Sequence, residues 1–206
     1  MEKGKFIVFE GCDGSGKTTV SAACAQKLQE EGYKVIYTRE PGGIEIAEQI
    51  RKVILNPDNT AMDPRTEALL YAASRRQHLV EKVLPALEQG IHVICDRFVI
   101  SSLVYQGYAR KIGVDEVMRV NDFAIEGHFP DYIIYLEIDP MTGLERVKNR
   151  TFLDRLDKED LSFHQDVHEG YRKVSEMFAD KIVSFDASCD ADTVIGHVMD
   201  YLREIL

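Results

Sequence analysis

The sequence has few cysteines, and none of them is spaced as in a metal site. Its four cysteines are scattered, without a CxxC pair and without a nearby pair of histidines. This pattern argues against a zinc site and against a disulfide framework, and it is typical of thiols in a reducing compartment. We therefore expect a cytoplasmic protein.

Long apolar runs and an excess of positive charge are also missing. No hydrophobic stretch approaches the length that spans a membrane, and the first residues run directly into a strand-like segment, so we expect no membrane partner and no signal peptide. The net charge of −10 argues against a nucleic-acid partner, which needs a basic face. A small phosphorylated substrate is still compatible, because a site's local field can oppose the global one.

Short segments rich in β-branched and aromatic residues alternate with helical patterns. We predict strands at residues 5–10, 33–38, 91–96, 131–137 and 181–185. Asp63 and Asp139, each followed by proline, are expected to cap helices, and Asp190 or Asp192 the last helix. The alternation predicts one α/β domain over residues 1–206, with a five-stranded parallel sheet flanked by helices on both faces. Ligands of such sheets bind at the carboxyl ends of the strands.

A glycine-rich run joins the first strand to the first helical segment. Residues 11–18 read Gly-Cys-Asp-Gly-Ser-Gly-Lys-Thr. The glycines let successive backbone N–H groups converge on an anion, and the helix directs its positive end to the same place. Lys17 is expected to reach the β- and γ-phosphates, and Thr18 to bind Mg²⁺. In this context the run predicts a nucleoside-triphosphate site rather than an ordinary turn.

Two other predicted strands end in charged residues. Asp96 follows an apolar strand and is expected to hold Mg²⁺ together with the glycine-rich loop. Arg97 comes next, and Arg39 precedes Glu-Pro-Gly-Gly at 40–43. Arginine binds phosphate with two parallel hydrogen bonds, so both arginines are candidate phosphate contacts. The alternatives are a turn aspartate, a solvated arginine and a plain strand-to-helix turn.

Two helical segments carry polar pairs four residues apart. Tyr71 and Arg75 share one helix face, as do Ser102 and Gln106. A ring that stacks on a base and an arginine that donates to its carbonyl form a plausible base-reading pair. Glutamine suits the N3/O4 or N3/O2 edge of a pyrimidine. From spacing alone, ordinary half-buried helix faces remain an alternative for both pairs.

A highly charged segment at about 148–160 separates two helical patterns and is the predicted lid. Its Arg150 and Arg155 are candidates to neutralise a transferring phosphoryl group. The alternative is that they pair with acidic neighbours on a solvated surface.

Together these motifs resemble the thymidylate kinase family. The resemblance is collinear to about residue 172 and is carried by residues 10–18, 38–43, 70–75, 96–98, 101–107 and 155–157. It implies phosphorylation of dTMP to dTDP with ATP and Mg²⁺, by direct in-line transfer, in a homodimer packed through helices. It also implies a cis bond between Glu40 and Pro41.

The resemblance further implies roles for individual residues. The implied ATP site comprises Gly11, Cys12, Asp13, Gly14, Ser15, Gly16, Lys17, Thr18, Thr19 and Arg146, with Arg146 against the adenine. The implied dTMP site comprises Asp13 at the 3′-hydroxyl, Arg39, Glu40, Pro41, Tyr71 stacked on thymine, Arg75 at O4, Arg97, Ser102, Tyr105 against the 2′ position, and Gln106. The implied metal residues are Thr18 and Asp96, and the implied catalytic residues are Lys17, Arg39, Arg97, Arg150 and Arg155.

The chain departs from one branch of that family at Gly14. That branch carries a catalytic arginine there, so the resemblance implies that the lid arginines supply the charge instead, and we favour Arg155 over Arg150. Phe98 stands where tyrosine is commoner, which removes a hydroxyl.

Three other readings are compatible with parts of the pattern. A kinase of another nucleoside monophosphate or of a nucleoside is the nearest, although Arg75, Tyr105 and Gln106 favour a deoxypyrimidine monophosphate. A regulatory switch NTPase would not need the second anion pocket of Arg39 and Arg97. A binding protein that has lost catalysis is disfavoured by the complete set of charged residues.

Overall fold

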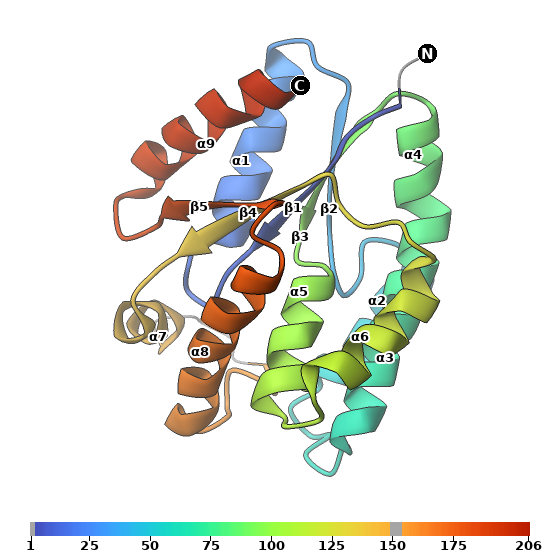
Figure 1. Ribbon diagram of the computed structural model, residues 1–206, viewed down its shortest axis with the longest axis vertical. Coiled ribbons are helices and arrows are strands. Elements are labelled where there is room, and N and C mark those ends of the chain that lie inside the picture. Colours follow the sequence, from blue (N-terminus) through green and yellow to red (C-terminus); the bar gives the residue numbers. More distant parts are fainter. Residues whose placement is uncertain (1–2, 149–153) are drawn as a thin grey trace.

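A parallel five-stranded sheet forms the centre of the molecule (Figure 1). The computed structural model describes residues 3–148 and 154–206. The strands lie in the order β2-β3-β1-β4-β5. Their bounds are β1 (Phe6–Glu10), β2 (Val35–Arg39), β3 (His92–Asp96), β4 (Tyr132–Glu137) and β5 (Ile182–Asp186). The predicted sheet is thus confirmed, with small shifts at the strand ends.

Helices connect the strands and cover both faces of the sheet. They are α1 (Lys17–Glu30), α2 (Glu45–Leu55), α3 (Pro64–His78), α4 (Leu84–Glu88), α5 (Val99–Ser102), α6 (Val114–Ile125), α7 (Pro140–Lys148), α8 (Leu161–Met177) and α9 (Ala191–Ile205), with π-helical segments η1 (Leu79–Val83) and η2 (Leu103–Ala109). Within the described ranges, none of them combines the length and the apolar character needed to cross a bilayer.

Alternate residues of each central strand point into two separate cores. In β1, Ile7 and Phe9 pack with residues of α1 and α9, whereas Phe6 and Val8 pack with residues of η1, α5, η2 and α8. Figure 1 shows α1 and α9 together on one side of the sheet and α5 and α8 on the other. Both faces are therefore buried, as expected for a parallel sheet.

Aspartates begin several of the helices, as predicted. The carboxylate of Asp63 accepts from the main-chain N–H groups of Arg65 and Thr66 at 2.9 and 3.1 Å. Of the two candidates for the last helix, Asp190 is the cap, because it accepts from the N–H of Thr193 at 3.0 Å. These bonds satisfy N–H groups that a helix leaves unpaired at its amino end.

Two helices contain π-helical turns that the sequence did not predict. The run from α3 through η1 to α4 is continuous, and so is the run from α5 through η2. Tyr105 and Gln106, two of the predicted site residues, belong to η2. Such turns occur often at functional sites, but no residue type in this segment marks one.

Candidate active site

Two positions of the loop between β1 and α1 require glycine. Gly14 and Gly16 have φ angles of 82° and 85°, a conformation that residues with a side chain rarely adopt. Gly14 also has no room for one, because a Cβ would lie 2.1 Å from the carbonyl oxygen of Gly143 in α7. The loop therefore offers main-chain N–H groups just ahead of α1, as an anion site requires.

Lys17 and Thr18, the first residues of α1, lie beside the end of β3. The buried ammonium of Lys17 donates to the main-chain oxygen of Cys12 at 2.7 Å. The hydroxyl of Thr18 donates to Oδ2 of Asp96 at 2.5 Å, because β1 and β3 pair in parallel and end at one edge. The other oxygen of Asp96 is buried and has no hydrogen-bond partner among the described residues. This pair offers a hard cation two oxygen ligands.

Burial changes the protonation of two side chains in the loop. The pKa of Lys17 is lowered to about 8, chiefly by burial and next by the charge of Arg97. Burial raises the pKa of the Cys12 thiol to about 12, so the thiol is neutral and unreactive. A bound phosphate would favour the charged form of Lys17.

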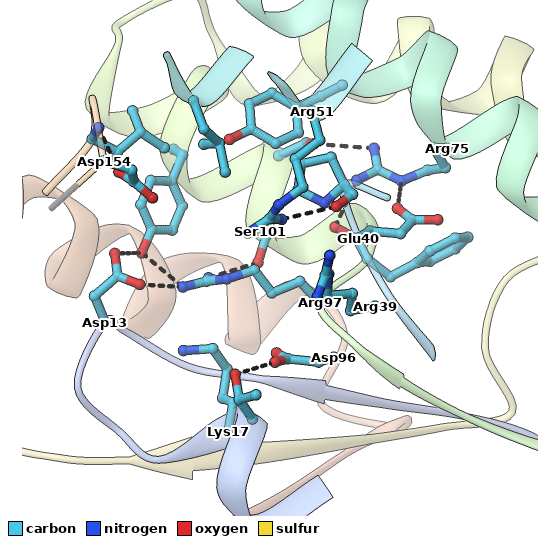
Figure 2. A pocket seen from close by; sticks show the side chains of 18 of the residues that line it. Asp13, Lys17, Arg39, Glu40, Arg51, Arg75, Asp96, Arg97, Ser101 and Asp154 are labelled. Carbon is cyan, nitrogen blue, oxygen red and sulfur yellow. Dashed lines mark hydrogen bonds and ion pairs between the residues drawn. The ribbon is translucent and has the colours of Figure 1, made fainter. Parts of the chain in front are cut away.

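Arg97 extends from the end of β3 across the cavity. Figure 2 shows its guanidinium beside Asp13, with the side chain of Lys17 below it. Arg97 donates to the carboxylate of Asp13 and, at 3.1 Å, to the hydroxyl of Ser101. The hydroxyl of Tyr105 donates to the second oxygen of Asp13 at 2.6 Å. Arg97, which follows Asp96 in the chain, is thus also joined to Asp13 of the glycine-rich loop.

Two more arginines line the cavity, Arg39 at the end of β2 and Arg51 in α2. Arg39 is half exposed and forms an ion pair with Glu48 at 2.7 Å. Arg51 in α2 donates to the carbonyl oxygen of Pro41 at 2.8 Å. The Glu40–Pro41 bond is cis, as the resemblance implies. Sequence reasoning missed Arg51, because nothing in its local spacing distinguishes it from a solvated helix residue.

Arg75 is buried, lines the cavity, and joins several elements there. Its Nε donates to Glu40 at 2.8 Å, and its Nη1 donates to Ser102 at 3.0 Å and to Asn121. Its Nη2 donates to the carbonyl oxygen of Phe98 at 2.9 Å. One of the five N–H groups of the guanidinium therefore has no acceptor within the described part of the chain.

Gln106 and Tyr71 complete this end of the cavity. The Nε2 amide of Gln106 donates to Oε1 of Glu67 at 2.7 Å, and both side chains are buried. Tyr71 lies one helical turn from Arg75 on α3, and burial holds the pKa of its phenol above the ordinary range. Glu67 was not among the predicted site residues, because its partners lie far away in sequence.

One cavity of about 580 Å³ collects these side chains. The predicted residues that line it are Asp13, Gly14, Gly16, Lys17, Thr18, Thr19, Arg39, Glu40, Pro41, Tyr71, Arg75, Asp96, Arg97, Ser102, Tyr105, Gln106 and Arg146. The lining residues that were not among the predicted site residues are Arg51, Leu55, Phe98, Ser101, Asp154 and Leu156. Gly11, Cys12 and Ser15 belong to the loop but do not line the cavity.

Of the two predicted lid arginines, the structure describes only Arg155, which does not line the cavity. Arg155 is buried, forms an ion pair with Glu67, and donates from Nε to the carbonyl oxygen of Ile54 at 2.9 Å. Arg150 lies outside the described residues. Arg146, on α7, donates to the carbonyl oxygen of Gly14 at 3.3 Å and so borders the phosphate loop. A role of Arg155 in the transfer stays a prediction, and it requires this side chain to leave Glu67.

Comparisons with known proteins identify the family. The family model for thymidylate kinase matches residues 9–195. The chain belongs to the thymidylate kinase family.

Curated thymidylate kinases are similar over nearly the whole chain. Those of Geobacillus sp. (strain WCH70) and Clostridium novyi (strain NT) are 55% and 54% identical to it, each over 98% of this chain and over 99% and 100% of their own lengths. The crystal structure of thymidylate kinase from Ehrlichia chaffeensis superimposes with a TM-score of 0.80 at 30% identity, covering 98% of this chain and 99% of that one.

Membership of this family gives the reaction. The enzyme is an ATP-dependent nucleoside monophosphate kinase that phosphorylates dTMP to dTDP. The two anionic nucleotides of a thymidylate kinase need cations at separate places, and the cavity has them at the phosphate loop and beyond the ends of β2 and β3.

Proposed function

We propose that the two nucleotides occupy opposite ends of the cavity. ATP binds with its phosphates on the loop of residues 11–18, in contact with Lys17, and with its adenine beside Arg146. The acceptor dTMP binds between Arg97 and Tyr71. The observation that carries this proposal is that one cavity joins a main-chain anion site to a second group of arginines.

Thr18 and Asp96 fit a magnesium ion. The fit rests on the buried Oδ1 of Asp96, which has no hydrogen-bond partner in the described part of the chain, next to a hydroxyl that already bonds to Oδ2. When bound, Mg²⁺ neutralises charge on the β- and γ-phosphates. Thr18 and Asp96 are the residues that would hold it, directly or through water.

The acceptor site is assigned residue by residue. Arg39 and Arg97 bind the phosphate of dTMP, and Asp13 accepts from its 3′-hydroxyl. Tyr105, whose hydroxyl is fixed by Asp13, fills the space that a ribose 2′-hydroxyl would need. Tyr71 stacks on the thymine ring, the remaining N–H of Arg75 donates to O4, and Ser102 and Gln106 line the base edge.

The transfer itself needs no general base. The phosphate of dTMP is largely dianionic near neutral pH. One of its oxygens attacks the γ-phosphorus of ATP. The bond from that phosphorus to the β–γ bridging oxygen breaks, and ADP leaves with the electron pair. Lys17, Arg39 and Arg97 hold two mutually repelling anions together and offset their charge. The lid arginines Arg150 and Arg155 are proposed to add to this when the lid closes.

We also infer a homodimer packed through helices. Large apolar side chains are exposed on the neighbouring elements α2, α3, η1 and α6, namely Ile46, Val53, Leu69, Val80 and Phe123. Clustered exposed apolar side chains mark protein–protein interfaces. We further propose one kinase domain over residues 1–206 in the cytoplasm, supported by four free cysteines.

The test of the proposed function is ADP formation from Mg-ATP with one acceptor at a time. The acceptors are dTMP, dUMP, dCMP, dGMP, UMP and thymidine. We expect rapid ADP formation with dTMP, and slower formation with UMP because its 2′-hydroxyl meets Tyr105. Equal ADP release with no acceptor would contradict the assignment of a second anion site.

A further inference from the structure

Glu67 is a buried carboxylate behind the base end of the cavity. It lies in the first turn of α3 and is 1% exposed. Three side chains donate to it: Gln106 to Oε1 at 2.7 Å, Arg110 to Oε2 at 3.3 Å and, more weakly, to Oε1 at 3.5 Å, and Arg155 to Oε2. Of these three, only Gln106 lines the cavity. The charge of Glu67 is thus balanced by two arginines that do not line the cavity. Of its three partners, only the side-chain amide of Gln106 connects Glu67 to the cavity.

The chemistry of that contact fixes which way the amide of Gln106 faces. A carboxylate can only accept hydrogen bonds, whereas an amide has two N–H donors on one side and an acceptor oxygen on the other. The atom of Gln106 that faces Glu67 must therefore be the nitrogen. Turning the amide over would place two acceptor oxygens against each other in a buried site, which is costly. Gln106 keeps its carbonyl oxygen and its second N–H for a ligand.

This orientation distinguishes two kinds of pyrimidine. Thymine has a donor at N3 and an acceptor at C4, whereas cytosine has an acceptor at N3 and a donor amine at C4. The free carbonyl oxygen of Gln106 matches the N3–H of thymine and opposes the N3 lone pair of cytosine. A glutamine free to turn would accommodate either base.

We propose that Glu67 is a positioning residue that locks the Gln106 amide and thereby selects 4-oxopyrimidines against 4-aminopyrimidines. The inference rests on the proposed function, in which Gln106 lines the base edge of dTMP. Glu67 itself does not touch the nucleotide. It acts by forbidding the orientation of Gln106 that suits cytosine.

The test is the ratio of kcat/KM for dTMP to that for dCMP in Glu67→Gln. In this variant Arg110 and Arg155 hold the single carbonyl oxygen of the new amide, so its NH₂ group faces Gln106 and favours the opposite orientation. We expect the ratio to fall about tenfold, the size of one mismatched buried hydrogen bond. A variant that slows both acceptors equally and keeps the wild-type ratio would overturn the proposal.

Two further variants separate orientation from loss of the ion pairs. Arg110→Gln removes a guanidinium from Glu67 but leaves the bond to Gln106, so the ratio should stay close to that of the wild type. Gln106→Glu alone sets two carboxylates face to face and should bind dTMP poorly. The double variant E67Q/Q106E restores a donor facing an acceptor and should regain most of the ratio. Failure of the double variant to improve on Gln106→Glu would contradict the lock.

If Glu67→Gln does not fold, an NMR measurement on the wild-type enzyme tests the proposal instead. In ¹⁵N-labelled protein, the side-chain signals of Gln106 are those missing from Gln106→Leu. One of its amide protons should lie well downfield, because a hydrogen bond to a carboxylate is charge-assisted. Two amide protons at ordinary glutamine positions would overturn the proposal. A wild-type enzyme with no preference for dTMP over dCMP would instead contradict the proposed base site.

Discussion

The two ends of the cavity are built from the chain in different ways. At the phosphate end, the anion site comes from one continuous loop, residues 11–18, with Asp96 from the adjacent strand. At the base end, Arg75 and Gln106 are joined to residues far away in sequence, such as Glu40 and Glu67. We refer to these as the phosphate end and the base end.

The difference lies in what holds each site in shape. Main-chain geometry shapes the phosphate end, because the glycine φ angles and the start of α1 suffice to direct N–H groups at an anion. Buried ion pairs shape the base end, and the same bonds also join α3 to neighbouring elements. Removing a charged side chain at the phosphate end should therefore affect catalysis alone, whereas removing one at the base end should also affect folding.

The largest expected effect is the loss of activity in Lys17→Met. We propose that Lys17 offsets charge on the transferred group, so removing this cation should lower kcat by about 10³-fold or more. The unfolding midpoint in urea should not fall, because the buried lysine has a lowered pKa and gains little from its surroundings. Steady-state kinetics and urea titration measure both quantities, with the exposed Lys34→Met as the control. A large loss of stability in Lys17→Met would break the comparison.

The matching change at the base end is Arg75→Met. It leaves Glu40 buried beside His78 without its guanidinium, so the free energy of unfolding should fall by about 3 kcal/mol or more. The neighbouring Arg76, which pairs with Glu126 at the surface, is the control, and Arg76→Met should cost less than about 1 kcal/mol. Equal stability losses in the two variants would show that the buried network does not hold this end together.

The same contrast explains which parts of the molecule were predictable. The sheet and the phosphate end were predicted because their signals are local: short apolar strands, a glycine run followed by Lys17 and Thr18, and an aspartate that ends a strand. Glu67 and Arg51 were missed, because their roles depend on partners brought together only by folding.

The position of Arg155 could not be predicted from its neighbours in the sequence. A charged segment predicts a solvated lid, yet this side chain is buried against Glu67 and the carbonyl oxygen of Ile54. The π-helical turn that holds Gln106 likewise leaves no mark on residue type.

A smaller effect is expected for glycine substitutions in the phosphate loop. Gly14→Ala meets both an unfavourable φ angle and the carbonyl oxygen of Gly143, whereas Gly16→Ala meets only the φ angle. The φ strain costs about 1–3 kcal/mol, and only Gly14→Ala should in addition displace α7 and weaken ATP binding. Titration with ATP compares the two variants. Similar ATP affinities in both would mean that the contact with Gly143 does not shape the loop.

The smallest expected effect is a pH dependence of ATP binding. Because the pKa of Lys17 is about 8 in the free enzyme, the ammonium is present below that pH and is lost above it. ATP binds the protonated form, so the dissociation constant should rise above pH 8, approaching about tenfold per pH unit. Lys17→Met should lack this dependence. A wild-type dissociation constant that stays level from pH 7 to about 9 would contradict the lowered pKa.

The central claim is that the base end selects its nucleotide at the binding step, through Arg75 and Gln106. Calorimetric titration of the enzyme with dTMP and with dCMP, in the absence of ATP, tests it most directly. Two mismatched hydrogen bonds, at N3 and at C4, predict that dTMP binds about 100-fold more tightly. Equal affinities for the two nucleotides would contradict the claim.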